Sequence, residues 1–149
     1  MNIQLITTDK KHFLSLLLLA DEQESMIDRY LERGDLFVMF DAEAIPISVA
    51  VVTDEGNGVR ELKNLAVAPT CQRKGYGRQM VEFVSRYYAD VCHTLLVGTG
   101  ESRQTLSFYR SCGFTYSHTV ADFFTRNYDH PIVEDGKVLK DMIYLRKNV

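Results

Sequence analysis

The chain has 149 residues, enough for one domain with a single core, and 46% of them are hydrophobic while 25% are charged, as in soluble globular proteins. A formal net charge of −3 argues against a general nucleic-acid-binding protein, because phosphate contacts require a basic excess. The three cysteines are odd in number and form no C-x-x-C pair, so they indicate neither a metal site nor a disulfide framework.

The N-terminal segment lacks the layout of a signal peptide, and its apolar run Leu16–Ala20 is too short to span a bilayer. We therefore expect a cytoplasmic protein with reduced thiols and no membrane association. Residues 1–149 contain no internal repeat, low-complexity tract or linker, which predicts a single domain.

The first third of the chain begins with an alternating strand at Asn2–Thr7, followed by a helical stretch over Asp9–Leu19. Asp21 has the pattern of a helix N-cap, with Glu24 three residues later as its capping-box partner. Apolar residues then recur at helical spacing, and Gly34 closes the pattern. The sequence therefore predicts two helices after the first strand.

Three strands follow. Leu36–Phe40 is the first, and Ile45–Val52 is the second, with Pro46 indicating that it begins at an edge or a bulge. The Asn-Gly pair within Asp54–Gly58 predicts a hairpin turn. In the third strand, Val59–Val67, the apolar residues change parity, so either both faces are buried or the strand carries a bulge.

The second half alternates between helices and strands. In chain order we expect a loop at Pro69–Lys74, a helix whose apolar face runs from Met80 to Tyr88, a strand at His93–Val97, a helix at Ser102–Cys112 and closing strands at Phe114–Val120 and Val138–Leu145. An aromatic-rich connection joins the last two strands. This order predicts an α/β (α+β) domain with a mixed sheet.

A basic, glycine-containing loop precedes the helix that starts near Met80. Its sequence, Gln72–Arg78, joins a strand to a helix, so its N–H groups and the helix dipole favour an anion, and Gly75 and Gly77 permit close approach. The loop is neither a P-loop nor a dinucleotide fingerprint, whose third glycine would stand at Met80. The pattern alone leaves two interpretations: a phosphate site or a strand-to-helix turn with solvated cations.

The wider context resembles a known family. The segment "LKNLAVAPTCQRKGYGRQMVEFV" resembles the acyl-CoA-binding signature of the GNAT superfamily of N-acetyltransferases, in which Q/R-x-x-G-x-G/A follows a V-x-P strand end. The segment "SFYRSCGF", residues 107–114, is similar to a later helix-turn of that family. The resemblance covers nearly the whole chain. It implies acetyl-CoA as cofactor and the GNAT fold: a single mixed, mostly antiparallel sheet with splayed central strands, flanked by helices.

The resemblance also implies the cofactor contacts. Strand residues Leu65, Ala66 and Val67 would hydrogen-bond the pantetheine arm as an added strand does, with Thr99 and Gly100 across the cleft. Relatives often carry an Asn after the Gly-Thr-Gly; here Glu101 and Ser102 follow, and Ser102 either replaces that contact or, as we prefer, caps the next helix. The loop residues that would surround the pyrophosphate are Gln72, Arg73, Lys74, Gly75, Tyr76, Gly77 and Arg78.

Acetyl transfer to an amine requires proton handling. An alkylammonium with a pKa near 10.4 costs about 4.6 kcal/mol to deprotonate at pH 7. The resemblance makes Glu61 the candidate general base, acting through water, and Tyr109 the candidate acid for the departing CoA thiolate. The alternatives are a solvent-facing strand carboxylate for Glu61 and a core-filling role for Tyr109.

The acceptor is expected at two acidic segments near the open end of the cleft. In residues 122–136 we assign substrate binding to Asp122, Phe124, Tyr128 and Glu134, because carboxylates and aromatic faces suit a small cationic amine. Asp21 and Glu24, in the other segment, are instead expected to cap a helix. A protein N-terminus or lysine is the alternative acceptor, and a CoA-binding sensor or scaffold without turnover is the alternative function. Whether the chain forms a homodimer, as is frequent in the superfamily, stays open.

Overall fold

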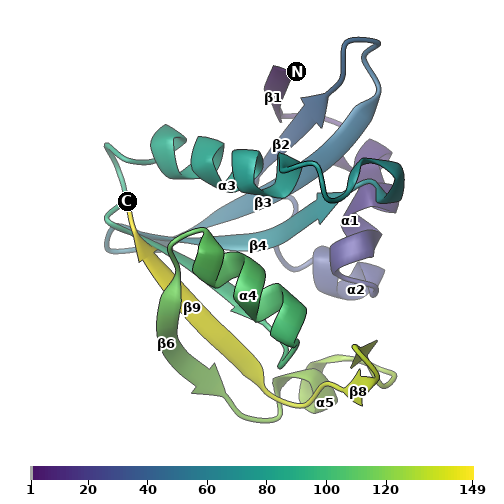
Figure 1. Ribbon diagram of the computed structural model, residues 1–149, viewed down its shortest axis with the longest axis vertical. Helices are drawn as coiled ribbons and strands as arrows, with labels where there is room; N and C mark the ends of the chain where they lie inside the picture. The colour runs from purple at the N-terminus through teal and green to yellow at the C-terminus, as the bar shows by residue number, and fades with distance from the viewer. Residues whose placement is uncertain (1) are drawn as a thin grey trace.

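The computed structural model describes residues 2–149 and contains one seven-stranded sheet (Figure 1). The strand order is β1-β2-β3-β4-β5-β9-β6, and of these neighbours only β4 and β5 run parallel. This is the mixed, mostly antiparallel sheet that the sequence predicts. Its strands are β1 (Asn2–Ile6), β2 (Asp35–Phe40), β3 (Pro46–Gly56), β4 (Val59–Val67), β5 (Thr94–Thr99), β6 (Thr115–Val120) and β9 (Met142–Asn148).

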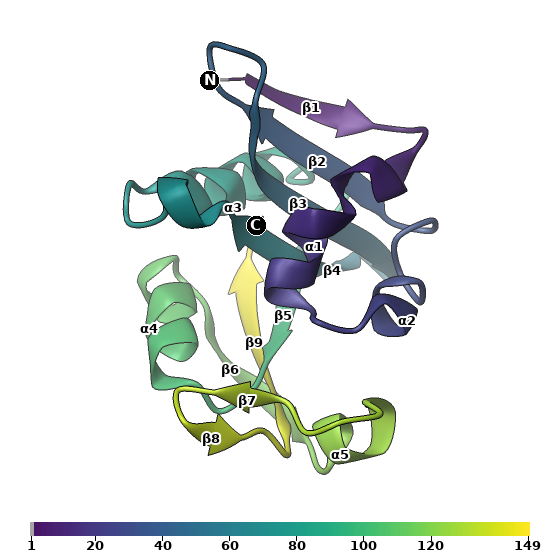
Figure 2. The same cartoon turned by 90° about the vertical axis from the view of Figure 1, so that its right-hand side faces the viewer.

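Helices cover both faces of the sheet centre. Figure 2 shows α1 on one side of β3 and β4, with α3 on the other. One apolar cluster fills the space between the sheet and α3 and α4, and a second lies against α1. The helices are α1 (Leu14–Ala20), α2 (Glu24–Ile27), α3 (Tyr76–Tyr87), α4 (Arg103–Ser111) and α5 (Phe123–Asn127), with 3₁₀ turns at Lys10–Phe13 and Pro69–Cys71.

The parity change in β4 is a β-bulge. In β3, Val52 lies opposite Leu62, and the residue before it, Val51, lies opposite Asn64. Lys63 is therefore the extra residue of β4. A bulge bends its strand and re-aims the side chains beside it. The sequence left burial of both faces and a bulge as alternatives; the structure shows the bulge.

The central strands diverge directly after this bulge. The parallel pairing of β4 with β5 extends from Val59 to Leu62 and stops there. Beyond it, Leu65, Ala66 and Val67 pair only with β3, so the β5-facing edge of β4 keeps its backbone groups unpaired by strands. The splayed central strands predicted from the family resemblance are therefore present.

The second predicted helix is present only as a single short turn, and its predicted length is wrong. Only Glu24–Ile27 is α-helical, and irregular turns continue to Gly34. The N-cap is Gln23 without a side-chain cap, so Asp21 and Glu24 do not form the predicted capping box. The buried Lys10 ammonium instead donates to the carbonyls of Leu31, Glu32 and Gly34, at 3.0, 3.2 and 2.7 Å. Carbonyls bound in this way replace a regular helix with a turn closed by tertiary contact.

The connection after β6 contains more structure than the sequence indicates. It holds α5 and a small hairpin of β7 (Val133–Glu134) and β8 (Lys137–Val138), and the predicted closing strand Val138–Leu145 is divided between β8 and β9. A separate apolar cluster in this part of the chain consists of Phe124, Ile132 and Leu139. Among residues 2–149, no helix is long and apolar enough to cross a membrane.

Candidate active site

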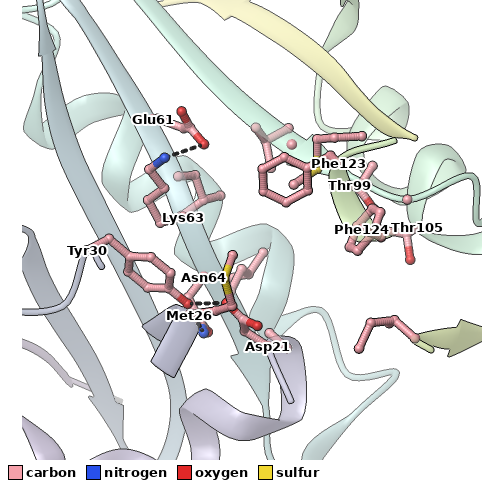
Figure 3. Close-up of a pocket in the computed structure, with 18 of the residues that line it drawn as sticks. Asp21, Met26, Tyr30, Glu61, Lys63, Asn64, Thr99, Thr105, Phe123 and Phe124 are labelled. Atoms are coloured by element: carbon pink, nitrogen blue, oxygen red, sulfur yellow. Dashed lines mark hydrogen bonds and ion pairs between the residues drawn. The ribbon is translucent and has the colours of Figure 1, made fainter. Parts of the chain in front are cut away.

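A cleft of about 420 Å³ lies where β4 and β5 separate (Figure 3). One wall comes from the segment between α1 and α2 and from the bulged part of β4, and the other from β5, α4, α5 and β9. The predicted catalytic residues Glu61 and Tyr109 both line it. The splay of the strands thus creates a space reached by residues that are distant in the sequence.

Glu61 is a buried carboxylate that pairs with Lys63. The residue is 6% exposed, and its Oε2 lies 3.1 Å from Lys63 Nζ. Burial raises the pKa of Glu61 above its ordinary value, while the Lys63 ammonium acts in the opposite direction. The interpretation of Glu61 as a solvent-facing carboxylate is therefore wrong. Beside it, Arg33 pairs with Glu55 at 3.0 Å.

Tyr109 projects from α4 and is 7% exposed. Its ring packs edge-on against Phe114, with ring centroids 5.5 Å apart. Burial, with smaller contributions from Cys112 and Glu134, raises the pKa of the phenol, so the hydroxyl keeps its proton over the physiological range. The ring of Tyr109 therefore packs in the core, and the residue also borders the cleft, so its role as the acid stays a prediction.

The glycine loop presents a set of free backbone donors. Within residues 2–149, the N–H groups of residues 73–78 donate no hydrogen bond. Gly75 is the N-cap of α3 with φ of 86°, a left-handed conformation that suits glycine, and open space surrounds the position of a Cβ. Free donors at the N-terminus of a twelve-residue helix form an anion-binding site, and they fit a pyrophosphate.

Side chains of this loop attach it to neighbouring elements. Gln72 Nε2 donates to the Val67 carbonyl at 3.0 Å, which holds the loop against the end of β4. Arg78 donates from Nη1 to the Ser111 carbonyl at 2.9 Å and joins α3 to α4. A Cβ on Gly77 would lie 3.2 Å from the Phe108 ring, so this glycine permits helix packing. Arg73, with φ of 63°, Lys74 and Tyr76 complete the loop.

The far side of the slot is formed by β5 and the start of α4. Thr99 and Gly100 line the cleft as predicted, opposite Leu65. Ser102 is the N-cap of α4: its hydroxyl accepts from Thr105 N at 3.4 Å and donates to Asp135 Oδ2 at 2.6 Å. The capping role preferred for Ser102 is confirmed.

The residues predicted for acceptor binding divide into two groups. Phe124, Tyr128 and Glu134 line the cleft. Asp122 lies outside the cleft lining, and its Oδ1 is 3.6 Å from Lys140 Nζ. Burial, and then the neighbouring Asp135, raises the pKa of Glu134.

The cleft residues that were not assigned from the sequence include Tyr30, Lys63, Asn64 and Phe123. The parity change in β4 was the available signal for two of them, because a bulge turns adjacent residues toward one side. Tyr30 was interpreted only as part of a helix face. Phe123 was noted among the aromatic residues of its segment but was not assigned to the site.

A splayed sheet, a helix N-terminus with free donors, and a buried carboxyl group and phenol in one cleft are the features expected of a CoA-dependent acyltransferase of the acetyltransferase type. The family model for the acetyltransferase (GNAT) domain matches residues 32–116. A Bacillus subtilis (strain 168) protein described as the uncharacterized N-acetyltransferase YvbK is 35% identical over 150 residues, covering 97% of this chain and 94% of the relative. The chain therefore belongs to the GNAT family of N-acetyltransferases.

Solved structures agree with this assignment. A GNAT family acetyltransferase from Elizabethkingia anophelis with acetyl-CoA bound superimposes with a TM-score of 0.93 at 32% identity, covering 99% of this chain and 97% of that one. A Bacillus subtilis acetyltransferase in complex with CoA has a TM-score of 0.91 at 33% identity, covering 99% and 98%. The fold is the GNAT fold, and acetyl-CoA is the acetyl donor.

Proposed function

We propose that the protein transfers the acetyl group of acetyl-CoA directly to a primary amine of a small cationic molecule, with Glu61 as general base and Tyr109 as general acid. The main observation in support is that a buried carboxylate and a buried phenol line one cleft beside the slot between β4 and β5. Acetyl-CoA supplies an activated acyl thioester, and the chain must supply orientation and proton transfer.

The cofactor slot orients the donor. The free N–H groups of residues 73–78 hold the pyrophosphate, and the unpaired edge of β4 at Leu65–Val67 holds the pantetheine arm by strand-like hydrogen bonds. Thr99 and Gly100 close the opposite side. A strand N–H at Leu65–Val67 also supports the oxyanion that forms when the amine attacks the carbonyl.

Glu61 removes the proton that the amine must lose. A carboxylate whose pKa is raised by burial is a stronger base than an exposed one, and Lys63 keeps it ionised. The proton reaches Glu61 through water. As the C–S bond breaks, its electron pair stays on sulfur, and the neutral Tyr109 hydroxyl donates to that developing thiolate.

The shape of the cleft supports a small acceptor. Contacts across its end join two distant segments: Asp129 N donates to Gln23 Oε1 at 3.0 Å, and His130 Nε2 lies 2.8 Å from Glu22 Oε1. These contacts restrict the opening of the cleft, whereas an acceptor on the surface of a folded protein would need a wide opening. Phe124, Tyr128 and Glu134 then contact the acceptor, since aromatic faces and a carboxylate favour a cation.

The test measures release of free CoA thiol from acetyl-CoA with a panel of small amines, an N-terminal peptide and a lysine peptide. We expect turnover with small cationic amines and a loss of roughly 10²- to 10⁴-fold in Glu61→Gln and Tyr109→Phe. Glu24→Gln, an exposed residue paired with Lys11, is the matched control and should retain activity. Saturable acetyl-CoA binding without release for any amine would instead favour a CoA sensor, and turnover of peptides alone would favour a protein acetyltransferase.

A further inference from the structure

Asp21 is a cleft carboxylate held by two tyrosines. Tyr30 Oη donates to its Oδ2 at 2.9 Å, and Tyr128 Oη donates to its Oδ1 at 2.7 Å. The two phenols come from segments about a hundred residues apart, so they meet only in the folded protein. Burial raises the pKa of Asp21, and both phenol hydrogen bonds act against that increase. These bonds stabilise the ionised carboxylate in a partly buried position.

No cation in residues 2–149 lies within 4.0 Å of the Asp21 carboxylate. Three other charges of the cleft have partners within the protein: Lys63 pairs with Glu61, Arg33 pairs with Glu55, and Glu22 pairs with His130. Glu134, assigned above to acceptor binding, has no ion pair among residues 2–149 either. Arg29 is exposed and donates to the Asn127 amide oxygen at 2.9 Å. Because a partly desolvated carboxylate gains from a cationic partner, Asp21 is suited to a cationic ligand.

The surroundings of Asp21 add two independent features. Asn64 is 2% exposed, lines the cleft and donates through Nδ2 to Tyr30 Oη at 3.1 Å, yet its Oδ1 has no hydrogen-bond partner among the described residues. Figure 3 shows Phe123 and Phe124 across the opening from Asp21, and Tyr128 stacks on Phe124 with ring centroids 5.6 Å apart. An unused acceptor and aromatic rings both favour an N–H-bearing cation.

We propose that Asp21, with the Tyr30 and Tyr128 phenols and Asn64, forms a subsite for a second, non-reacting ammonium group of the acceptor. The acceptor class is thus an alkyl diamine or polyamine, with one amine at the Asp21 subsite and the other presented to Glu61. This inference rests on the proposed function for the reacting amine only. The ammonium at Asp21 stays protonated, because a carboxylate partner favours the charged form. Asp21 thereby binds the ammonium group that does not react, and Glu61 deprotonates the amine that does.

The kinetic test compares diaminopentane with pentylamine, which have the same chain but differ in one ammonium group. In the wild-type protein we expect a kcat/KM for the diamine about 10- to 100-fold above that for the monoamine, as hydrogen bonds to charged groups allow. Asp21→Asn keeps the shape and a hydrogen-bonding side chain but removes the charge, so kcat/KM for diaminopentane should fall much more than kcat/KM for pentylamine and the preference should disappear. Glu24→Gln, on the same segment and paired with Lys11, should keep the preference.

A binding measurement separates this inference from the proposed reaction. Calorimetric titration of diaminopentane into the protein with CoA present needs no turnover. Binding in the wild type that weakens at least tenfold in a folded Asp21→Asn variant supports the subsite, even if no amine is acetylated. Equal affinity for diamine and monoamine, equal loss of both in Asp21→Asn, or no diamine binding at all would overturn it. Thermal unfolding of each variant identifies a loss caused by misfolding.

Discussion

Lys63→Met should move the acid limb of the pH–rate profile to higher pH. The Lys63 ammonium lies 3.1 Å from the Glu61 carboxylate and lowers the pKa of Glu61 against the effect of burial. Without Lys63, burial and the Glu55 charge still raise the pKa of Glu61, and the smaller effect of Arg33 remains to lower it. Glu61 then takes up a proton at a higher pH and stops acting as a base there. Met keeps much of the side-chain volume of Lys, so the bulge itself should persist.

The geometry gives the size of this shift. Two unit charges separated by 3.1 Å attract by about 5 kcal/mol at an effective dielectric constant of about 20. That is an upper bound, because the Lys63 side chain is 21% exposed and is partly screened by solvent. Opposite charges at this range shift a pKa by roughly 1–3 units, and we expect the acid limb to move by about 1–2 units.

The assay records kcat/KM for the best amine at saturating acetyl-CoA from about pH 5 to 11. The second limb, from the amine itself with a pKa near 10, serves as an internal reference. Lys63→Arg should keep the wild-type limb, and Lys11→Met, at an exposed pair with Glu24, should not move it. An unmoved limb in a folded Lys63→Met variant would show that Glu61 is not the base that this profile reports.

The same variant makes a prediction for stability. The folded-state pKa of Glu61 lies above its unfolded value and would rise further without Lys63. A carboxyl group of this kind stabilises the folded protein below its unfolded pKa, and that contribution is lost as pH rises through the folded pKa. The unfolding free energy of Lys63→Met should therefore decrease from acidic to neutral pH more steeply than that of the wild type.

Three further substitutions address the rest of the site. Tyr109→Phe should lower kcat by roughly 10²- to 10⁴-fold with acetyl-CoA affinity nearly intact; full turnover would leave Tyr109 only its packing role. Gly75→Asp should weaken CoA binding at least about tenfold relative to the isosteric Gly75→Asn, because both residues tolerate positive φ but only Asp opposes the pyrophosphate charge. Glu134→Gln should raise KM for the amine severalfold, whereas Asp122→Asn, outside the cleft, should not; equal effects would contradict the placement of the acceptor.

The fold could be predicted from sequence wherever local pattern and tertiary packing favour the same structure. The Asn57-Gly58 turn forms as predicted, with positive φ at both residues, and the strands on either side form the β3–β4 hairpin. The apolar periodicity after Gly75 likewise predicts α3, whose residues Met80, Val81 and Val84 are fully buried. In each case the local conformational preference is the one that the core requires.

Prediction failed where distant groups decide the local structure. Asp21 and Glu24 have the spacing of a capping box, but Asp21 instead accepts hydrogen bonds from Tyr30 and Tyr128, and Glu24 pairs with Lys11. Tyr128 is 107 residues from Asp21, so no local pattern could indicate this bond. The short elements between residues 122 and 138 are likewise stabilised by packing on Leu139 rather than by their intrinsic helix or strand propensity. For this reason the sequence predicted only an irregular connection there.

The bulge at Lys63 links the cofactor slot to the chemistry. Pairing of β4 with β5 ends at Leu62, directly before the extra residue, so the strand edge from Leu65 onward becomes available to the pantetheine arm. The same extra residue breaks the alternation of side chains, so that Lys63 and Asn64 both line the cleft together with Glu61. An unbulged strand would direct adjacent residues to opposite faces and could not supply both the ammonium that tunes Glu61 and the amide beside Asp21. One inserted residue therefore opens the slot between the strands and places the groups that we propose select and deprotonate the acceptor.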